Sequence, residues 1–162
     1  MSFDVNERVE KAEQLFRSGY NCCQSVFMAY SDLYQVDRTL AATLSAPLGG
    51  GMGRLREVCG TVSGMSLLAG LQYPAPDAAT TPDAKTAKTK LYTVVQELAE
   101  KFRSENGAIV CRDLLGLAQQ KDEPTPSERT EAYYKRRPCV EYVKIAARIF
   151  GEKLQKEIQE KQ

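Results

Sequence analysis

Hydrophobic residues recur at helical spacing along most of the chain, and short polar segments with glycine, asparagine or proline separate the periodic stretches. The first stretch, residues 4–18, keeps its apolar side chains on one face and ends before Gly19, a typical helix stop. The second follows Asn21, a predicted N-cap with Gln24 three positions later, and runs through Leu33. Similar patterns predict helices over residues 38–45, 57–71, 83–104, 111–118, 128–135 and from 139 into the C-terminal tail. Because no stretch alternates like a strand, we predict an all-α bundle of seven or eight helices.

Length and composition favour one domain that folds on its own core. The chain has 162 residues, enough to bury most of its apolar surface without structural metals or disulfides. The proline-rich segment 73–82 separates two helical halves, but neither half is long enough to form a stable hydrophobic core of its own. A second polar segment, residues 119–128, is expected to form an exposed loop. We therefore expect residues 1–162 to form a single helical domain.

Charge and hydropathy exclude two classes of partner. The 22 basic and 21 acidic residues are interleaved, so the sequence carries no basic patch of the kind that binds nucleic acid. No stretch reaches the ~18 apolar residues that a membrane-spanning helix requires, and the first residues lack the pattern of a secretory signal. We expect a cytoplasmic protein that inserts into no membrane, and the sequence leaves open whether it forms a homo-oligomer.

The sequence contains no histidine, and this narrows the available chemistry. Imidazole-based catalytic triads, histidine-ligated zinc or haem and the usual near-neutral general base are all excluded. Five cysteines are then the conspicuous reactive side chains. Because cytosolic thiols are normally kept reduced, these residues are better explained as catalytic, metal-binding or inert thiols than as structural disulfides.

Most of the cysteines fall in the first turn of a predicted helix. The four that do so are Cys22, Cys59, Cys111 and Cys139. Unpaired amide groups and the positive end of a helix dipole can lower the pKa of a thiol from ~8.5 toward neutrality. No pair has CxxC spacing, so a shared site must come from tertiary packing, and we predict that these helix starts converge. For each cysteine taken alone, simple packing in the core is about as good an explanation.

A glycine-rich segment, "GGGMGRLRE", precedes Cys59. Its glycines can adopt positive φ, so the simpler interpretation is a tight turn. The alternative is a cradle for an anion, substrate or cofactor, which would be formed by Gly50, Gly51, Gly53 and Arg54. The tight turn is favoured, because the spacing and the lysine of a phosphate-binding loop are missing.

The arrangement of these segments resembles the C_GCAxxG_C_C family of redox-active proteins, which is named for cysteines in this order around a central CGAxxG element. The matching segments are "YNCCQSVF" with Cys22, "GGGMGRLREVCGTVSGM" with Cys59, "NGAIVCRDLLG" with Cys111 and "RPCVEYV" with Cys139. The resemblance covers about residues 8–150. Thr61 stands where the family motif has alanine, which adds a hydroxyl near Cys59. Cys23 lies outside the family pattern, so we expect it to be inert.

Three functions are consistent with these cysteines. The leading hypothesis is a thiol redox protein in which Cys59 is the reactive thiolate and one of the other three motif cysteines resolves it as a disulfide. Cys59 is chosen because the glycine-rich segment gives access to it and Arg54 and Arg56 favour the anion. The alternative uses the same four thiolates to hold an iron–sulfur cluster or a zinc ion. A binding protein without catalysis is the third interpretation, and the sequence names neither a redox partner nor a small-molecule ligand.

Overall fold

The computed structural model describes residues 1–75, 82–118 and 122–161, so parts of the two predicted loops lie outside it. Its α-helices are α1 (Val5–Arg17), α2 (Cys22–Tyr30), α3 (Arg38–Ser45), α4 (Gly49–Met52), α5 (Gly60–Gln72), α6 (Ala84–Asn106), α7 (Cys111–Leu115), α8 (Glu131–Arg136) and α9 (Cys139–Glu160). Two short 3₁₀ helices are η1 (Ser31–Tyr34) and η2 (Ala46–Leu48). The only extended pairing in the described residues is an isolated bridge between Val58 and Val110, so the predicted all-α fold is confirmed. Within these same residues, none of the helices combines the length and apolar character that crossing a membrane needs.

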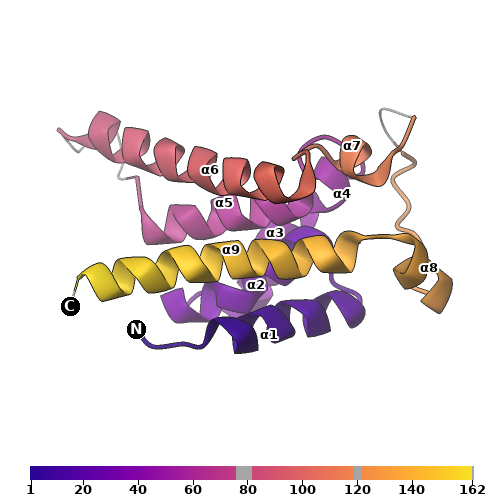
Figure 1. Cartoon of the computed structure of the whole chain (residues 1–162), viewed down its shortest axis with the longest axis horizontal. Coiled ribbons are helices and arrows are strands. Elements are labelled where there is room, and N and C mark those ends of the chain that lie inside the picture. Colours follow the sequence, from indigo (N-terminus) through magenta and orange to yellow (C-terminus); the bar gives the residue numbers. More distant parts are fainter. Residues whose placement is uncertain (76–81, 119–121, 162) are drawn as a thin grey trace.

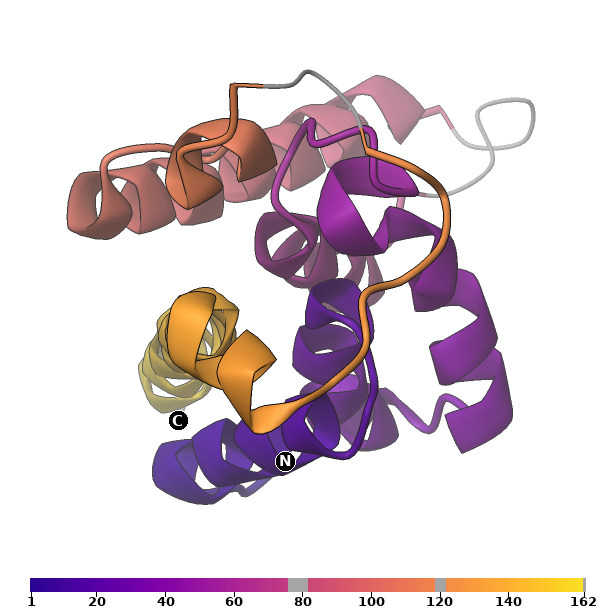
Figure 2. The ribbon, with the colours of Figure 1, turned by 90° about the vertical axis from the view of Figure 1, so that its right-hand side faces the viewer.

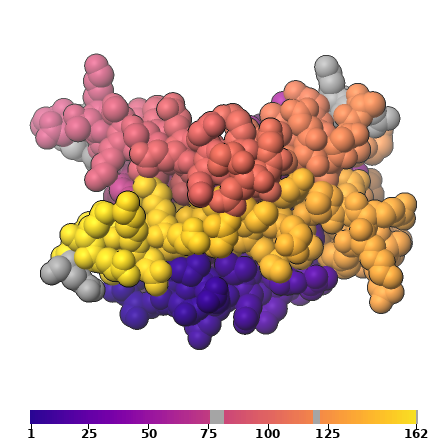
Figure 3. All heavy atoms as spheres, viewed as in Figure 1, coloured from indigo at the N-terminus to yellow at the C-terminus, as the bar shows by residue number. Residues whose placement is uncertain are grey.

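The long helix α9 runs through the middle of the molecule. It lies between α1 and α6 on the face shown in Figures 1 and 3, while α2 and α5 pack behind it. Helix α1 also packs against α2, and α2 packs in turn against α5. Both chain ends lie toward one end of this bundle, and α4, α7 and α8 gather at the other (Figure 1). Helices α2, α5 and α9 begin at this second end, which brings their first residues near one another.

Local sequence explains where several helices begin and end. Asp4 caps α1 by accepting a hydrogen bond from the backbone amide of Glu7 at 3.0 Å. Asn21 and Gln24 form the predicted capping box at the start of α2. Gly107 follows α6 with a φ of 87°, a conformation that favours glycine. These boundaries confirm the corresponding sequence predictions to within a few residues.

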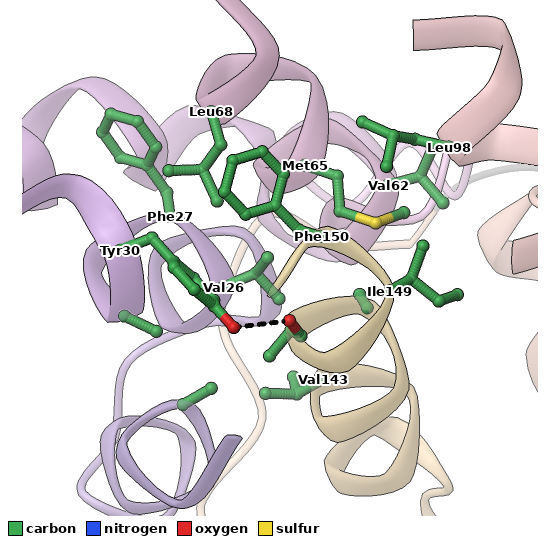
Figure 4. Close-up of a cluster of buried hydrophobic side chains, with 14 of the residues drawn as sticks. Val26, Phe27, Tyr30, Val62, Met65, Leu68, Leu98, Val143, Ile149 and Phe150 are labelled. Carbon is green, nitrogen blue, oxygen red and sulfur yellow. Dashed lines mark hydrogen bonds between the residues drawn. The ribbon is translucent and has the colours of Figure 1, made fainter. Parts of the chain in front are cut away.

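An apolar core fills the space between α1, α2, α5, α6 and α9 (Figure 4). The fully buried ring of Tyr30 packs edge-on against Phe150, with 5.1 Å between the ring centroids. The Tyr30 hydroxyl donates a 2.8 Å hydrogen bond to the carbonyl oxygen of Ala147, so this buried polar atom has a partner. Gly151 makes the approach feasible, because a Cβ at that position would overlap the Tyr30 hydroxyl. The core thus joins α2 to α9 by packing and by a buried hydrogen bond.

Small residues on α5 let it approach α2 closely. A Cβ on Gly64 would lie 2.9 Å from the Cβ of Val26, and one on Gly60 would overlap the sulfur of Cys22. Gly60 directly follows Cys59 in the chain, so the Cys22 sulfur lies close to the start of α5. The packing of these helices therefore also joins the first two cysteine-bearing segments.

Residues 122–130, which include the described part of the second predicted loop, are mostly exposed as predicted, but their backbone is also bonded to the glycine-rich segment. They cross the end of the bundle from the region of α7 to α8 (Figure 2). The Arg54 side chain donates to the carbonyl oxygen of Glu123 at 2.6 Å, and the amide of Asp122 donates to the carbonyl oxygen of Arg54 at 2.9 Å. Several side chains of this segment are exposed, but its backbone is anchored to the glycine-rich segment.

Candidate functional site

Four of the five cysteines line one cavity of about 360 Å³ at the end of the bundle where α4, α7 and α8 gather. They are the four that the sequence singles out, Cys22, Cys59, Cys111 and Cys139. All five cysteines are free thiols. Cys23 is fully buried in the core and does not line the cavity. The expected convergence of the four segments is therefore found in the structure.

Each cavity cysteine stands at the start of a helix. Three are the first residues of α2, α7 and α9, and Cys59 is the N-cap of α5. The amide of Cys59 donates to the carbonyl oxygen of Ile109 at 2.8 Å, and the amide of Cys111 donates to that of Glu57 at 2.6 Å. The segments that precede α5 and α7 are therefore joined by backbone hydrogen bonds, which hold two of the cysteines side by side.

The glycine-rich segment has an unusual backbone. Five consecutive residues, from Gly50 to Arg54, have φ between 58° and 68°, so this segment winds left-handed and α4, which overlaps it, is not a regular right-handed helix. Glycine adopts these angles readily. For Met52 and Arg54, the same angles cost roughly 1–2 kcal/mol of conformational free energy per residue. The predicted need for positive φ is confirmed. Gly50, Gly53 and Arg54 also line the cavity, so a tight turn and a wall of a binding site are compatible here.

Gly51 lies behind the cavity wall instead of lining it. A Cβ on Gly51 would lie 2.7 Å from the Cβ of Cys111 and 2.8 Å from the Cα of Arg56. Any larger residue would therefore push these two apart. Gly51 thus lets the segment carry Arg56 close to Cys111.

Among the described residues, Arg56 is the one cationic side chain that hydrogen-bonds a cysteine sulfur. It is the one charged residue in the described part of the chain that is buried, with 5 % exposure. Its guanidinium donates to the Cys111 sulfur at 3.6 Å and to one carboxylate oxygen of Asp122 at 3.2 and 2.8 Å. Burial acts to lower the pKa of Arg56, but the hydrogen bonds to Cys111 and Asp122 outweigh it and raise that pKa. The sequence analysis paired Arg56 with Cys59, but the hydrogen bond that its guanidinium makes to a cysteine is to Cys111.

Cys59 lacks the environment that the sequence predicts. Its sulfur lies 3.1 Å from the hydroxyl oxygen of Thr61, so the predicted hydroxyl neighbour is confirmed. Only 6 % of Cys59 is exposed, and this burial raises the pKa of its thiol, with a further rise caused by the charge of Cys22. The prediction of a lowered pKa at Cys59 is therefore wrong, because desolvation outweighs the favourable amides at the helix start.

Cys22 and Cys139 are the two half-buried cysteines of the cavity. Burial raises the pKa of Cys22, while a hydrogen bond from the backbone amide of Gly50 acts in the opposite direction. Burial also raises the pKa of Cys139 to about 12, with smaller rises from Cys22 and Cys111 and an opposing effect of Arg137. Because the sulfurs share one cavity, ionising one of them makes it harder to ionise the next.

Residues 20–153 match the family described as "Putative redox-active protein (C_GCAxxG_C_C)". The chain belongs to this family. The matched range contains all four cavity cysteines and the glycine-rich segment, in agreement with the resemblance seen in the sequence. No curated protein and no solved structure matches the chain. The family description supports a redox role in general terms.

In this member of the C_GCAxxG_C_C family, the cavity contains further side chains that sequence reasoning missed. They include the apolar side chains of Phe16, Ala46, Leu114, Leu115, Pro124 and Pro126. Arg129 is the main polar one, and its guanidinium donates to the carbonyl oxygens of Phe16 and Tyr20, both at 3.2 Å. Nothing in its local sequence distinguishes Arg129 from other arginines in polar loops. It reaches the cavity because residues 122–130 cross the end of the bundle.

The four C_GCAxxG_C_C cysteines are not grouped as a preformed metal centre in the part of the chain that the structure describes. Across residues 1–75, 82–118 and 122–161, no group of three or more histidine, cysteine, aspartate or glutamate side chains is arranged to hold a metal ion. Two of the four cavity sulfurs contact other polar side chains, Cys59 with Thr61 and Cys111 with Arg56. These contacts leave the thiolates able to bind a metal, so the four-thiolate site for zinc or an iron–sulfur cluster stays a prediction from the sequence.

Proposed function

We propose that this protein carries out thiol–disulfide exchange, with Cys111 as the attacking sulfur and Cys22 as the resolving sulfur. The supporting observation is the 3.6 Å contact between the buried Arg56 guanidinium and the Cys111 sulfur, in the wall of a cavity shared by four thiols. The thiolate is the nucleophile in disulfide exchange, and a neighbouring guanidinium favours the thiolate form. Cys111 replaces Cys59 in this role. Both cysteines are buried, but the side-chain partner of Cys111 is the Arg56 guanidinium, whereas that of Cys59 is the neutral Thr61 hydroxyl.

Cys22 is assigned as the resolving thiol for three reasons. The charge of Cys111 contributes to the raised pKa of Cys22, after burial, so the two sulfurs are electrostatically coupled. The backbone of Gly50 acts to lower the pKa of Cys22, which helps this sulfur to carry negative charge during exchange. Cys22 is also half-buried, whereas Cys59 is buried.

The proposed reaction conserves atoms and electrons. The Cys111 thiolate attacks one sulfur of a substrate disulfide, forms a mixed disulfide and expels the first substrate thiolate, which takes up a proton. The Cys22 thiolate then attacks the Cys111 sulfur and expels the second substrate thiolate, which is protonated in the same way. Two electrons and two protons thus pass from the cavity thiols to the substrate, and a Cys22–Cys111 disulfide is left. A small thiol reductant restores the dithiol by the reverse steps.

Disulfide mapping tests this proposal. Protein that has been reduced without oxygen is treated with bis(2-hydroxyethyl) disulfide, a small neutral oxidant, then alkylated, digested and analysed by mass spectrometry. We expect the loss of two thiols and a peptide that links Cys22 to Cys111. The Cys22→Ala variant should stop at the mixed disulfide on Cys111, while Cys23→Ala, at the adjacent core position, should still form the link. A link between another pair contradicts the assignment, and retention of all the thiols contradicts the exchange reaction.

A further inference from the structure

The charges around the cavity are strongly unbalanced. The residues that line it include Arg54, Arg56, Arg129 and Arg137, and none of its described lining residues is acidic. The whole chain has 22 basic and 21 acidic residues, so the imbalance belongs to the cavity and not to the composition. Among the described residues, Asp122 is the one carboxylate that pairs with these arginines, and Arg54 and Arg56 share it. Positive charge therefore exceeds negative charge around the thiols.

Arg137 is the arginine best placed to meet a ligand. Within the part of the chain that the structure describes, its guanidinium forms no hydrogen bond or ion pair, and it lies 5.9 Å from the ring centroid of Tyr133. It is half-buried and stands two positions before Cys139. Arg129 differs, because its guanidinium nitrogens are already bonded to backbone carbonyl oxygens. Arg137 thus offers hydrogen-bond donors to the cavity that no described residue uses.

The size and lining of the cavity suit a small molecule with apolar and charged parts. Its volume of about 360 Å³ lies at the lower end of the range of small-molecule sites, ~300–1,000 Å³. Phe16, Leu114 and Leu115 give it apolar walls beside the arginines. A short carbon chain that ends in an anionic group would match both kinds of surface.

We infer that the substrate is a small disulfide that carries negatively charged groups. This inference rests on the proposed function, which supplies the disulfide, and it adds the charge. Guanidinium groups bind carboxylates and other oxyanions through paired hydrogen bonds. A cavity lined by one sign of charge also concentrates ligands of the opposite sign. One substrate disulfide becomes two anionic thiols, while the thiols of Cys22 and Cys111 become a disulfide.

Three disulfides of similar length test the inference: the dianion 3,3′-dithiodipropionate, neutral bis(2-hydroxyethyl) disulfide and the dication cystamine. The rate of protein thiol loss with each is divided by its rate with 2-mercaptoethanol, which corrects for intrinsic reactivity. We expect the corrected rate for the anionic disulfide to exceed that for the cationic one at least about 10-fold, and this ratio to shrink at high salt. Equal corrected rates would overturn the inference and leave the proposed function intact. Failure of all three to form the cavity disulfide would overturn both.

Substitution of Arg137 tests whether this residue recognises the negatively charged groups of the disulfide. Arg137→Gln should reduce the corrected anionic-to-cationic ratio several-fold, and Arg137→Lys should keep most of it because the charge is retained. Arg103→Gln is the matched control, since it changes the net charge equally but lies on α6, where Arg103 pairs with Glu100 and does not line the cavity. It should leave the ratio unchanged. Equal reductions in Arg137→Gln and Arg103→Gln would show an effect of overall charge and overturn the assignment.

Discussion

The core around Tyr30 and the cavity around Arg56 both bury a polar group, but in opposite ways. The Tyr30 hydroxyl has its partner in the backbone carbonyl of Ala147 and lies so close to α9 that only glycine fits at position 151. The Arg56 guanidinium divides its hydrogen bonds between Asp122 and a cysteine sulfur beside a cavity of about 360 Å³. A buried polar group that is bonded to backbone in a filled space serves stability. A buried polar group that contacts a reactive side chain next to a cavity can instead change the reactivity of that side chain.

Cys22 and Cys23 are neighbours in sequence, but one lines the cavity and the other lies in the core. We predict that Cys22→Ala slows turnover of a neutral disulfide by about 100-fold or more, because the mixed disulfide on Cys111 cannot be resolved. Cys23→Ala should retain turnover and lower the free energy of unfolding by ~1 kcal/mol, through the small cavity that it leaves. Thiol-release kinetics and urea denaturation measure these effects. Equal losses of turnover would show that the two positions are not functionally separate.

Two helical glycines sharpen the description of the core. Gly151→Ala should lower the free energy of unfolding by roughly 2–3 kcal/mol, because the new Cβ overlaps the Tyr30 hydroxyl. Gly70→Ala, on α5, meets no heavy atom within 4 Å and should raise the same free energy by about 0.5–1 kcal/mol through helix propensity. Chemical denaturation of both variants gives the comparison. If the two substitutions change the free energy of unfolding in the same direction, the close contact described between α2 and α9 is contradicted.

Removal of the Arg56 guanidinium should change the reactivity of Cys111 more than the stability of the fold. We expect Arg56→Met to slow the alkylation of Cys111 by about 10-fold, since the thiolate loses its cationic donor. The loss of stability should be about 1–2 kcal/mol, because Asp122 is partly exposed and keeps Arg54 nearby. Residue-resolved alkylation and urea denaturation test the two effects. An unchanged rate at Cys111 would show that the contact has no chemical consequence.

Alkaline pH should weaken the folded state through the buried thiols. The pKa of Cys139 is raised by burial to about 12, so its stabilising effect is complete below the unfolded-state pKa and is lost as pH rises toward the folded value. The contribution of Cys139 to the free energy of unfolding should fall by at most ~1.4 kcal/mol per pH unit above ~8.5. Denaturation of reduced protein at several pH values, with Cys139→Ala for comparison, measures it. A steeper decline in the variant than in the parent protein would contradict this assignment.

The helices could be predicted from sequence because their signals are local. The capping box of Asn21 and Gln24 spans three positions, and Gly107 ends α6 by its own backbone angle. The four cavity cysteines could also be singled out from sequence, because each stands at the start of a predicted helix. Both kinds of information lie within a few residues of the feature that they determine.

The chemical ranking of the cysteines was not predictable, because it depends on contacts between distant segments. Arg56 and Cys111 are 55 positions apart in sequence, and they meet because Gly51 allows the close approach of their segments. Burial of Cys59 is likewise set by tertiary packing, and it reverses the effect expected from the helix start. Charge near a thiol in sequence was therefore a poor guide to charge near its sulfur.

Competitive alkylation decides whether Arg56 makes Cys111 the reactive thiol of this protein. Fully reduced, metal-free protein is treated near pH 7 with a limiting amount of iodoacetamide, and the modification of each cysteine is measured by peptide mapping. We predict that Cys111 is modified first, at least about 10-fold faster than Cys59 and Cys23, because its thiolate has a guanidinium partner. Modification of Cys59 before Cys111, or of Cys111 no faster than Cys23, would contradict this assignment.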